Sequence, residues 1–453
     1  MMDTVNGERA VSEGRLTRLA LFLQQHRAIL VIIGIGLLCR LAALLFYLST
    51  HEWRGEVWEH ELIAQRLMEG KGLTMPSHGG VISVSAVDPI FPVLCYLLHL
   101  IGGPGLGLYY ALQLAVAGGI LWMTYSLGSQ LFDHRTGLLA ALLVALEPGL
   151  VIYHSYKVDH NALTMLLLLA AARFILLIAR SGDGRLALAC GVIIGMAVLM
   201  RPDQLSLFGM LLVWAWVERR RILTMIKPAG LVLLGAGIIL IPWVVRNSLL
   251  HGQLVFVTTY SGEALWRGNN PNSTGTGLTL DGQSQFEAAP AEFRSRISNA
   301  TEAQQNALFR EEALRYIRQD PAGFLWRCLK KLYYFWWFTP TYAAIYYEWV
   351  PISLVAVYRL LYGIALTLAI LGLWVTFRET RDAHVWIVLS IPLWMALIHS
   401  LSYVEGRHRV MVMPNILLLT ASGMLALMRG FQARWLSRRP VDGHRARRLA
   451  PLP

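Results

Sequence analysis

Charged residues are scarce in this chain. Asp, Glu, Lys and Arg make up 15% of its 453 residues, whereas soluble domains carry about 25%. Hydrophobic residues make up 55% and stand in long runs, so the natural structural unit is a membrane-spanning segment of roughly 20 residues. The composition excludes a soluble enzyme and predicts one polytopic membrane protein.

Cysteine is scarce as well. The four cysteines are scattered without paired spacing, which excludes a disulfide framework and a cysteine-rich metal site. The net charge of +12, from 40 Lys and Arg against 28 Asp and Glu, is typical of cytoplasmic loops in a membrane protein. Because no basic stretch outside the membrane segments is interleaved with stacking aromatic residues, we expect no nucleic-acid partner.

A signal-peptide cleavage site is also missing. Residues 1–27 are polar and carry several arginines, and the apolar run 28–48 that follows has no small-residue cleavage site after it. We therefore expect an uncleaved first spanning helix whose N-terminus lies in the cytoplasm.

Eleven apolar runs are present in total. They cover residues 28–48, 89–101, 106–132, 137–153, 161–179, 186–200, 204–217, 228–245, 352–377, 384–402 and 409–428. Lys and Arg at 219–227, 378–381 and 429–448 assign these segments to the cytoplasmic side. With the N-terminus also inside, the number of crossings must be even. The run 89–101, with about 13 residues and two prolines, is predicted to be re-entrant or interfacial.

The predicted fold is an all-α polytopic bundle of about ten transmembrane helices. It has a helical first long loop (51–105), and a second long loop (246–351) before the last three helices, both on the non-cytoplasmic side. The parts are a cytoplasmic tail (1–27), a transmembrane region (28–245) that includes the first long loop, the second long loop (246–351), C-terminal transmembrane helices (352–428) and a basic cytoplasmic tail (429–453). In the second long loop, helical periodicity at 301–319 precedes a stretch of Trp beside Lys and Arg, which predicts a helix on the membrane surface.

Acidic residues crowd the first long loop. Glu56, Glu59 and His60 fall within one or two turns of a probable short helix. Two close carboxylates raise one another's pKa, which suits a general base or a metal site. The alternative is a solvated polar helix on the membrane surface.

Ionisable residues interrupt the apolar runs at four other places on the same predicted face. These are Asp159 with His160, Arg201 with Asp203, Arg246 with Asn247, and a group from His399 to Arg409 that includes Tyr403, Glu405 and Arg407. Unpaired charges near lipid cost a few kcal/mol each, about 2.5–3.5 by insertion scales, and often mark functional sites. The alternative is a set of helix caps and snorkelling cations, whereas acids and arginines on one side could form one polar cavity.

Such a cavity suits a lipid-linked phosphate. Arg246, Arg407 and Arg409 offer forked donors to phosphate oxygens and keep their charge near lipid. The carboxylates could then deprotonate an acceptor hydroxyl or amine that attacks the phosphate-linked sugar carbon. His60 and Tyr403 are candidate substrate contacts. A transporter or flippase of a polar lipid is the alternative, although we find no internal repeat of the kind that many transporters have.

Several sequence stretches resemble a known family. WEHELIAQRLMEGKGLTMP and VDPIFPVLCYLLHLIG are similar to the first outer loop of bacterial relatives of the dolichyl-phosphate-mannose protein mannosyltransferases (family 39) and of the lipid A aminoarabinose transferase. These enzymes share the GT-C membrane fold. The similarity continues through KVDHNAL, GMAVLMRPD, IPWVVRNSLLHGQLVF, LWRGNNPNSTG and EGRHRVMVMP. It spans the chain from about residue 50 to 428.

The resemblance implies inverting transfer of a sugar from a polyprenyl phosphate, with an acid of the first long loop as catalytic base. Glu59 matches that position best. The protein mannosyltransferases have an adjacent Asp-Glu pair, whereas Glu56 and Glu59 stand apart here, so the choice between them stays open. Asp159 resembles the second acidic position, and Arg407 and Arg409 resemble arginines that face the donor phosphate.

The resemblance also bears on ligands and location. Asn269 and Asn270 match a GNNP turn, which either contacts substrate or only shapes the turn. Some relatives bind a divalent metal; the residue types here that could hold one are Glu59, His60, Asp159 and His160. Their spacing assigns no metal. We expect an integral protein of a bacterial inner membrane whose site faces the periplasm. Its partners would be a polyprenyl-phosphate-linked sugar, membrane lipids and a glycan, lipid or protein acceptor.

Overall fold

The computed structural model describes residues 24–50, 59–103, 105–155, 157–339, 352–379 and 382–437, and most of them are helical. In this part of the chain, six helices are long and apolar enough to cross a membrane. They are α2 (Arg27–Thr50), α5 (Gly107–Leu131), α8 (Asn161–Ser181), α11 (Ile222–His251), α17 (Ile352–Glu379) and α21 (Met413–Ser437). The all-α polytopic fold expected from the apolar runs is confirmed.

Shorter segments complete the bundle. They are α4 (Ile90–Gly102), α6 (His134–Leu146), α7 (Pro148–Tyr153), α9 (Gly184–Met200), η2 (Pro202–Phe208), α10 (Gly209–Val217), η3 (Arg219–Arg221), α18 (Val385–Leu389) and α19 (Ile391–Leu401). Helix α4 has 13 residues and is therefore about 20 Å long at 1.5 Å per residue. A hydrocarbon core is about 30 Å thick, so α4 is too short to cross it, as its sequence predicts.

Close helix pairs in the bundle meet at glycines. Helices α9 and α11 approach at Gly191 and Gly235, and α17 and α21 approach at Gly372 and Gly423. A Cβ atom at any of these positions would overlap backbone atoms of the facing helix. Because lipid tails are as apolar as the helix surfaces, the hydrophobic effect does not drive membrane helices together. Small residues allow the two backbones to approach closely and to associate through van der Waals contacts.

A buried arginine joins two helices inside the bundle. Arg40 of α2 donates from its two terminal nitrogens to the Ala145 carbonyl (3.1 Å) and the Val144 carbonyl (3.3 Å) at the end of α6. The last carbonyls of a helix have no intrahelical partner. Arg40 therefore satisfies the end of α6 while its own charge is kept away from lipid.

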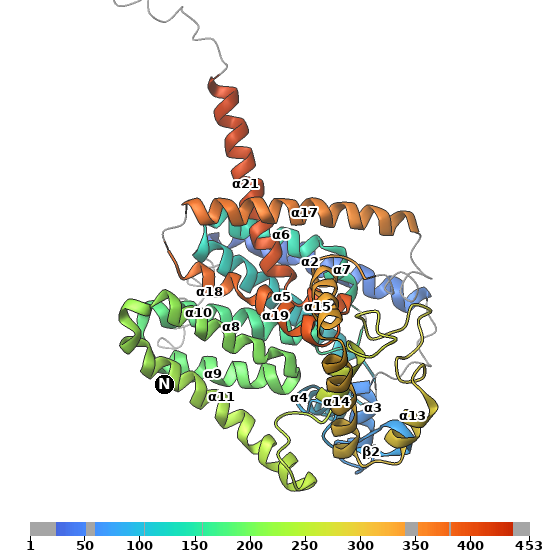
Figure 1. Cartoon of the computed structure of the whole chain (residues 1–453). Coiled ribbons are helices and arrows are strands. Elements are labelled where there is room, and N and C mark those ends of the chain that lie inside the picture. Colours follow the sequence, from blue (N-terminus) through green and yellow to red (C-terminus); the bar gives the residue numbers. More distant parts are fainter. Residues whose placement is uncertain are drawn as a thin grey trace, which may run out of the picture.

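The two long loops gather at one end of the bundle, at the lower right of Figure 1. The described part of the first long loop contains α3 (Glu59–Met68), β1 (Met75–Pro76), η1 (His78–Gly80), β2 (Ile82–Ser83) and α4. The strands pair antiparallel, Met75 with Ser83 and Pro76 with Ile82. The second long loop contains α12 (Ser261–Arg267), α13 (Ala291–Ser298), α14 (Glu302–Gln319) and α15 (Pro321–Trp336), and the last loop contains α20 (Gly406–Val410).

Helices α12, α13 and α14 share a small apolar core. Its buried members are Trp266, Ala289, Phe293, Ile297, Phe309 and Ala313. Thr301 and Gln304 form a reciprocal capping box at the start of α14, which satisfies two of the backbone donors that a helix leaves free. The helix coincides with the periodicity predicted at 301–319.

The first long loop is docked onto the second by a buried carboxylate. Glu302, the first residue of α14, accepts hydrogen bonds from the Val84 amide (2.7 Å), the Ser85 amide (2.9 Å) and the Thr259 hydroxyl. Nearby, His78 Nε2 lies 3.2 Å from Glu263 Oε2 of α12. These contacts position the first long loop, and with it α3, relative to the rest of the molecule.

Helix α15 has one apolar face that the protein leaves exposed. Leu325, Trp326, Leu329 and Tyr333 are exposed. Lys331 is fully buried on the other side and donates to Asn269 Oδ1 (3.0 Å) and to the carbonyls of Ser402 (2.8 Å), Gly268 (3.3 Å) and Leu401 (3.4 Å). Burial lowers the pKa of Lys331 to about 8. The exposed face agrees with the surface helix predicted here.

Candidate active site

Asp159 is the buried acid of the site. Its backbone N–H donates to the Tyr109 hydroxyl (3.0 Å), which itself donates to the Lys157 carbonyl (2.9 Å). Its Oδ1 accepts the Asn161 amide (2.8 Å) at the start of α8. Burial opposes ionisation, yet the neighbouring side chains of His160 and Lys157 hold the pKa of Asp159 well below its ordinary value. The protein therefore keeps a fixed negative charge at this helix end.

Two histidines from different loops face each other beside Asp159. His60 Nε2 lies 2.7 Å from His160 Nδ1, and Arg201 approaches His160 Nε2 at 3.4 Å. A guanidinium only donates, so His160 Nε2 accepts and its Nδ1 carries the proton toward His60. Burial lowers the pKa of both imidazoles. The pair is therefore neutral at pH 7 and has a defined tautomer.

A second acid–base network adjoins the first. Arg201 is ion-paired with Asp203, whose Oδ2 lies 3.1 Å from His399 Nε2. The ring of His399 stacks on that of His408, with centroids 3.7 Å apart. Burial opposes ionisation of Asp203, but Arg201 and His399 hold its pKa well below the ordinary value. Three of the four predicted polar clusters are thereby joined in space.

Arg407 is the partly exposed cation of the site. Its Nε lies 2.8 Å from Glu405 Oε2, and 34% of its side chain is exposed. Its charge acts on Asp159, on His60 and on Arg201. The structure therefore places a guanidinium from near the C-terminal end beside acids and imidazoles from the first half of the chain.

Glu59 is the first residue of α3 and is exposed. Its charge acts on His60 and on Asp88, so it lies at the edge of the same cluster. Glu56, the other candidate base, lies outside the described residues. Sequence reasoning assigned no role to Asp88, although the VDPIFP stretch contains it. Burial raises the pKa of Asp88 well above its ordinary value, so a second carboxyl group with a perturbed pKa joins the cluster.

The other two arginines predicted to bind phosphate contact groups of the protein. Arg409 stacks over the rings of Tyr362 (4.4 Å) and Phe338 (4.7 Å) and donates to the Trp337 carbonyl. Arg246 donates to the Val84 carbonyl (2.8 Å) and stacks over Trp243 (4.5 Å). Their guanidinium groups are thus also engaged by the protein itself, and the phosphate contact expected for them stays a prediction.

The asparagines of the GNNP turn hold the loop together. Asn269 donates to the carbonyls of Leu265 and Leu401, both at 2.8 Å, and accepts from Lys331. Asn270 donates to the Trp266 carbonyl (3.1 Å) and accepts the Asn272 amide (2.9 Å). These contacts favour the interpretation that the turn is structural. The substrate contact that is the alternative for either residue stays a prediction.

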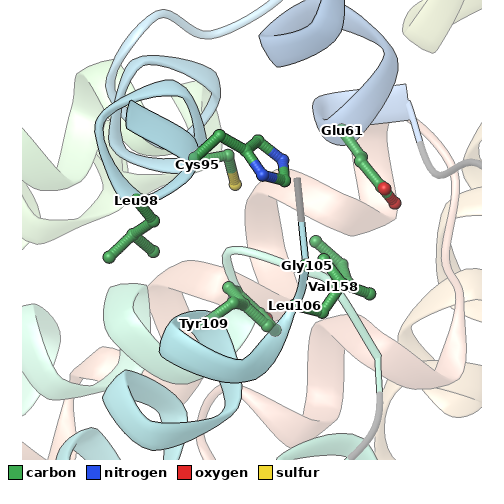
Figure 2. Close-up of a pocket in the computed structure, with 8 residues that line it drawn as sticks. Glu61, Cys95, Leu98, Gly105, Leu106, Tyr109 and Val158 are labelled. Atoms are coloured by element: carbon green, nitrogen blue, oxygen red, sulfur yellow. The ribbon is translucent and has the colours of Figure 1, made fainter. Parts of the chain in front are cut away.

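A small pocket lies next to the site, between α3, α4 and the start of α5 (Figure 2). It holds about 240 Å³ of empty space, open solvent included, and its lining includes Glu61, Cys95, His99 and Tyr109. Glu59 and Glu61 are two positions apart on α3 and so face roughly opposite sides of it. The pocket therefore lies away from Glu59, although its Tyr109 also holds the backbone of Asp159.

The residue types that could hold a metal ion do not come together as a ligand set in the described part of the chain. No group of three or more His, Cys, Asp or Glu side chains in the described part of the chain is arranged to hold a metal ion. His60 and His160 are directed at each other instead. We therefore derive no step through a metal.

Known proteins match this chain in part. Residues 88–245 match the family model of the dolichyl-phosphate-mannose-protein mannosyltransferases. That segment begins at Asp88 and contains Asp159, His160, Arg201 and Asp203. No curated protein matches the chain. The family resemblance predicted from the sequence is thus confirmed for the segment that carries most of the buried cluster.

Solved structures match the fold over most of the chain. The archaeal oligosaccharyltransferase AglB from Archaeoglobus fulgidus, in complex with an inhibitory peptide and a dolichol-phosphate, has a TM-score of 0.53 at 13% identity, over 94% of this chain and 54% of that one. The Archaeoglobus fulgidus oligosaccharyltransferase tethered with an acceptor peptide has a TM-score of 0.54 at 11% identity, over 91% and 51%. ArnT from Cupriavidus metallidurans bound to undecaprenyl phosphate has a TM-score of 0.41 at 13% identity, over 92% and 82%, too low to support an argument.

These matches define the class of the molecule. It is a polytopic helical membrane protein with the GT-C fold, as the sequence predicts. The chain spans about half the length of the oligosaccharyltransferases that it matches. Within that class, its segment 88–245 is similar to the dolichyl-phosphate-mannose-protein mannosyltransferases.

Proposed function

We propose that this protein is a membrane glycosyltransferase that moves a sugar from a polyprenyl phosphate to an acceptor hydroxyl or amine. The observation that carries the proposal is the assembly of Arg407 with Asp159 and His60 in one cluster. A guanidinium can bind the phosphate of such a donor, and carboxylates beside it can serve acid–base chemistry. The family match and the fold support the same class.

The proposed reaction is a single displacement. Glu59 takes the proton of the acceptor, whose oxygen or nitrogen attacks the anomeric carbon. The bond between that carbon and the phosphate oxygen breaks, and the electron pair leaves with the lipid phosphate. Arg407 stabilises the charge that develops there. One displacement inverts the configuration of the anomeric carbon. Asp159 keeps the two histidines oriented and can accept a hydrogen bond from the substrate.

The location of the cluster supports a lipid-borne donor. Asp159, Arg201 and Arg407 stand where membrane helices end, so a phosphate beside Arg407 would have its lipid tail within the bilayer. We assign this edge to the periplasmic side, because the basic loops predict the opposite ends to be cytoplasmic. The acceptor is a glycan, a lipid or a protein.

The test is turnover by purified protein in detergent. Undecaprenyl-phosphate-linked mannose or aminoarabinose is supplied with a membrane-lipid extract as acceptor, and release of undecaprenyl phosphate is measured. We expect Glu59→Gln to lose roughly 10²- to 10⁴-fold in rate, the usual contribution of a general base. Glu69→Gln is the matched control, since Glu69 lies exposed just after α3 and pairs with Lys71.

The outcomes separate the parts of the proposal. A Glu59→Gln protein with the wild-type rate removes Glu59 as the base and leaves Glu56. Wild-type rates in Glu56→Gln and Asp159→Asn as well would overturn the mechanism. Turnover without a sealed compartment also argues against a flippase, because transport requires two sides.

A further inference from the structure

Two tyrosines next to the site, the half-buried Tyr260 and the buried Tyr403, have hydroxyl groups that the described residues do not use. Tyr260 precedes α12 and Tyr403 follows α19. Tyr403 is only 8% exposed. Within the described residues, neither hydroxyl has a hydrogen-bond partner, although Tyr109, Tyr358 and Tyr362 all use theirs. Neither hydroxyl oxygen is among the fully enclosed polar atoms without a partner, so both are open to hydrogen bonds with a ligand at the site.

The rings that carry these hydroxyls are held in place. The ring of Tyr403 meets that of His408 edge to face, with centroids 5.5 Å apart. The guanidinium of Arg267 lies 5.4 Å from the ring centre of Tyr260. Arg267 is itself fixed by Glu263 (2.6 Å), which also faces His78. Both hydroxyls are therefore preorganised.

Tyr260 and Tyr403 lie near each other and near the candidate active site. Tyr260 interacts electrostatically with Tyr403 and with Arg407. Arg267 interacts with both tyrosines. Arg407 also acts on Asp159 and His60. Arg407 is thus within electrostatic range both of Asp159 and His60 and of Tyr260.

The chemistry of the pair selects a class of ligand. A phenol hydroxyl both donates and accepts a hydrogen bond, and burial raises the pKa of Tyr260 well above its ordinary value, which keeps it neutral. The charge of Arg267 is compensated by Glu263. The surface therefore offers neutral donors and acceptors beside aromatic rings, which matches the hydroxyl groups of a sugar.

We propose that Tyr260 and Tyr403 form the subsite that binds the transferred sugar of the donor, each through one sugar hydroxyl. The inference rests on the proposed function, because it takes Arg407 as the contact of the donor phosphate. The sugar is one bond away from that phosphate, so its hydroxyls would reach the adjacent tyrosines. A glycan acceptor has the same chemistry, and the experiment distinguishes the two sources.

The experiment compares lipids with and without the sugar. Dissociation constants are measured for undecaprenyl phosphate and for undecaprenyl-phosphate-linked mannose and aminoarabinose, with wild type, Tyr260→Phe and Tyr403→Phe. We expect each variant to bind the preferred sugar-bearing lipid roughly two- to tenfold more weakly, as the loss of one hydrogen bond predicts. Binding of undecaprenyl phosphate should not change. Tyr333→Phe on the exposed face of α15 is the matched control.

Three results would overturn the assignment. These are unchanged binding of all lipids, equal weakening for the bare and the sugar-bearing lipid, and a defect that appears only in the KM of an added glycan acceptor. The failure of the proposed function looks different. In that case the wild-type protein binds neither lipid, or the Arg407→Gln variant binds both lipids with the affinity of the wild-type protein. Melting temperatures of the variants in detergent exclude misfolding as the cause of any loss.

Discussion

At the scale of single residues, the direction of a side chain decides its role. Arg407 and Arg409 stand two positions apart and were equivalent in sequence. In the structure Arg407 is beside the acids, whereas Arg409 is sandwiched against Tyr362 and Phe338. Sequence could not separate them, because the aromatic partners of Arg409 lie about 50 and 70 residues away in the chain. The residue types were predictable and their partners were not.

This difference predicts opposite phenotypes for two matched variants. Arg407→Gln should weaken binding of undecaprenyl phosphate at least tenfold, since charge-assisted hydrogen bonds contribute roughly 1.5–3 kcal/mol. Arg409→Gln should leave that binding unchanged and lower the melting temperature, because a desolvated cation–π contact contributes about 2 kcal/mol. Titration with the lipid and thermal melting in detergent measure the two effects. If Arg409→Gln lost lipid binding at an unchanged melting temperature, Arg409 would return to the phosphate site.

At the scale of elements, apolar runs and periodicity predicted most helices, including α14 and α15. The points at which a helix ends inside an apolar run were harder to predict from the sequence. The run 137–153 forms α6 and α7, because Glu147 caps α7 through the Leu150 amide just before Pro148. The run 204–217 begins as the 3₁₀ turn η2, with Pro202 at its first position. Which helices pack against each other was not predictable either, because the sequence does not show which helix a given glycine faces.

The glycine contacts make a prediction about packing. Gly423→Ala in α21 should destabilise the protein by about 1–3 kcal/mol, the usual effect of overpacking, because its Cβ would overlap the Leu368 carbonyl of α17. Gly430→Ala in the same helix meets open space and should be neutral or slightly stabilising. Thermal melting of the two proteins in one detergent measures the difference. Equal melting temperatures would show that α17 and α21 do not approach as closely as described.

At the scale of the whole molecule, the site is assembled from segments far apart in the chain. Membrane topology predicted that the polar clusters share one face, and three of them do form one network. The second long loop contains candidate site residues, but the contacts that Glu302 and Lys331 make with other loops were not predicted. Their partners lie in other loops, so neither composition nor spacing marks them. Sequence identified the groups at helix ends, and packing decided which of them meet.

The docking of the two long loops predicts a long-range effect on catalysis. Glu302→Ala would leave the half-buried Val84 amide and the buried Ser85 amide without their acceptor, at a cost of about 1–3 kcal/mol for the buried group. The first long loop should then open locally, and hydrogen–deuterium exchange over residues 75–88 should become faster. Since α3 precedes this segment and carries Glu59, kcat should fall while the affinity for undecaprenyl phosphate at Arg407 is kept.

Glu311→Ala is the control. Glu311 is exposed on the same helix, and its substitution removes the same charge as Glu302→Ala. It should alter neither exchange nor turnover. Faster exchange with unchanged kcat would mean that α3 keeps its place without the docking contact, so that its packing on α4 alone positions Glu59. Unchanged exchange in Glu302→Ala would mean that Arg246, through the Val84 carbonyl, is sufficient to hold the loop. Faster exchange together with a lower kcat, both absent from the control, would establish that a carboxylate of the second long loop positions the base of the first.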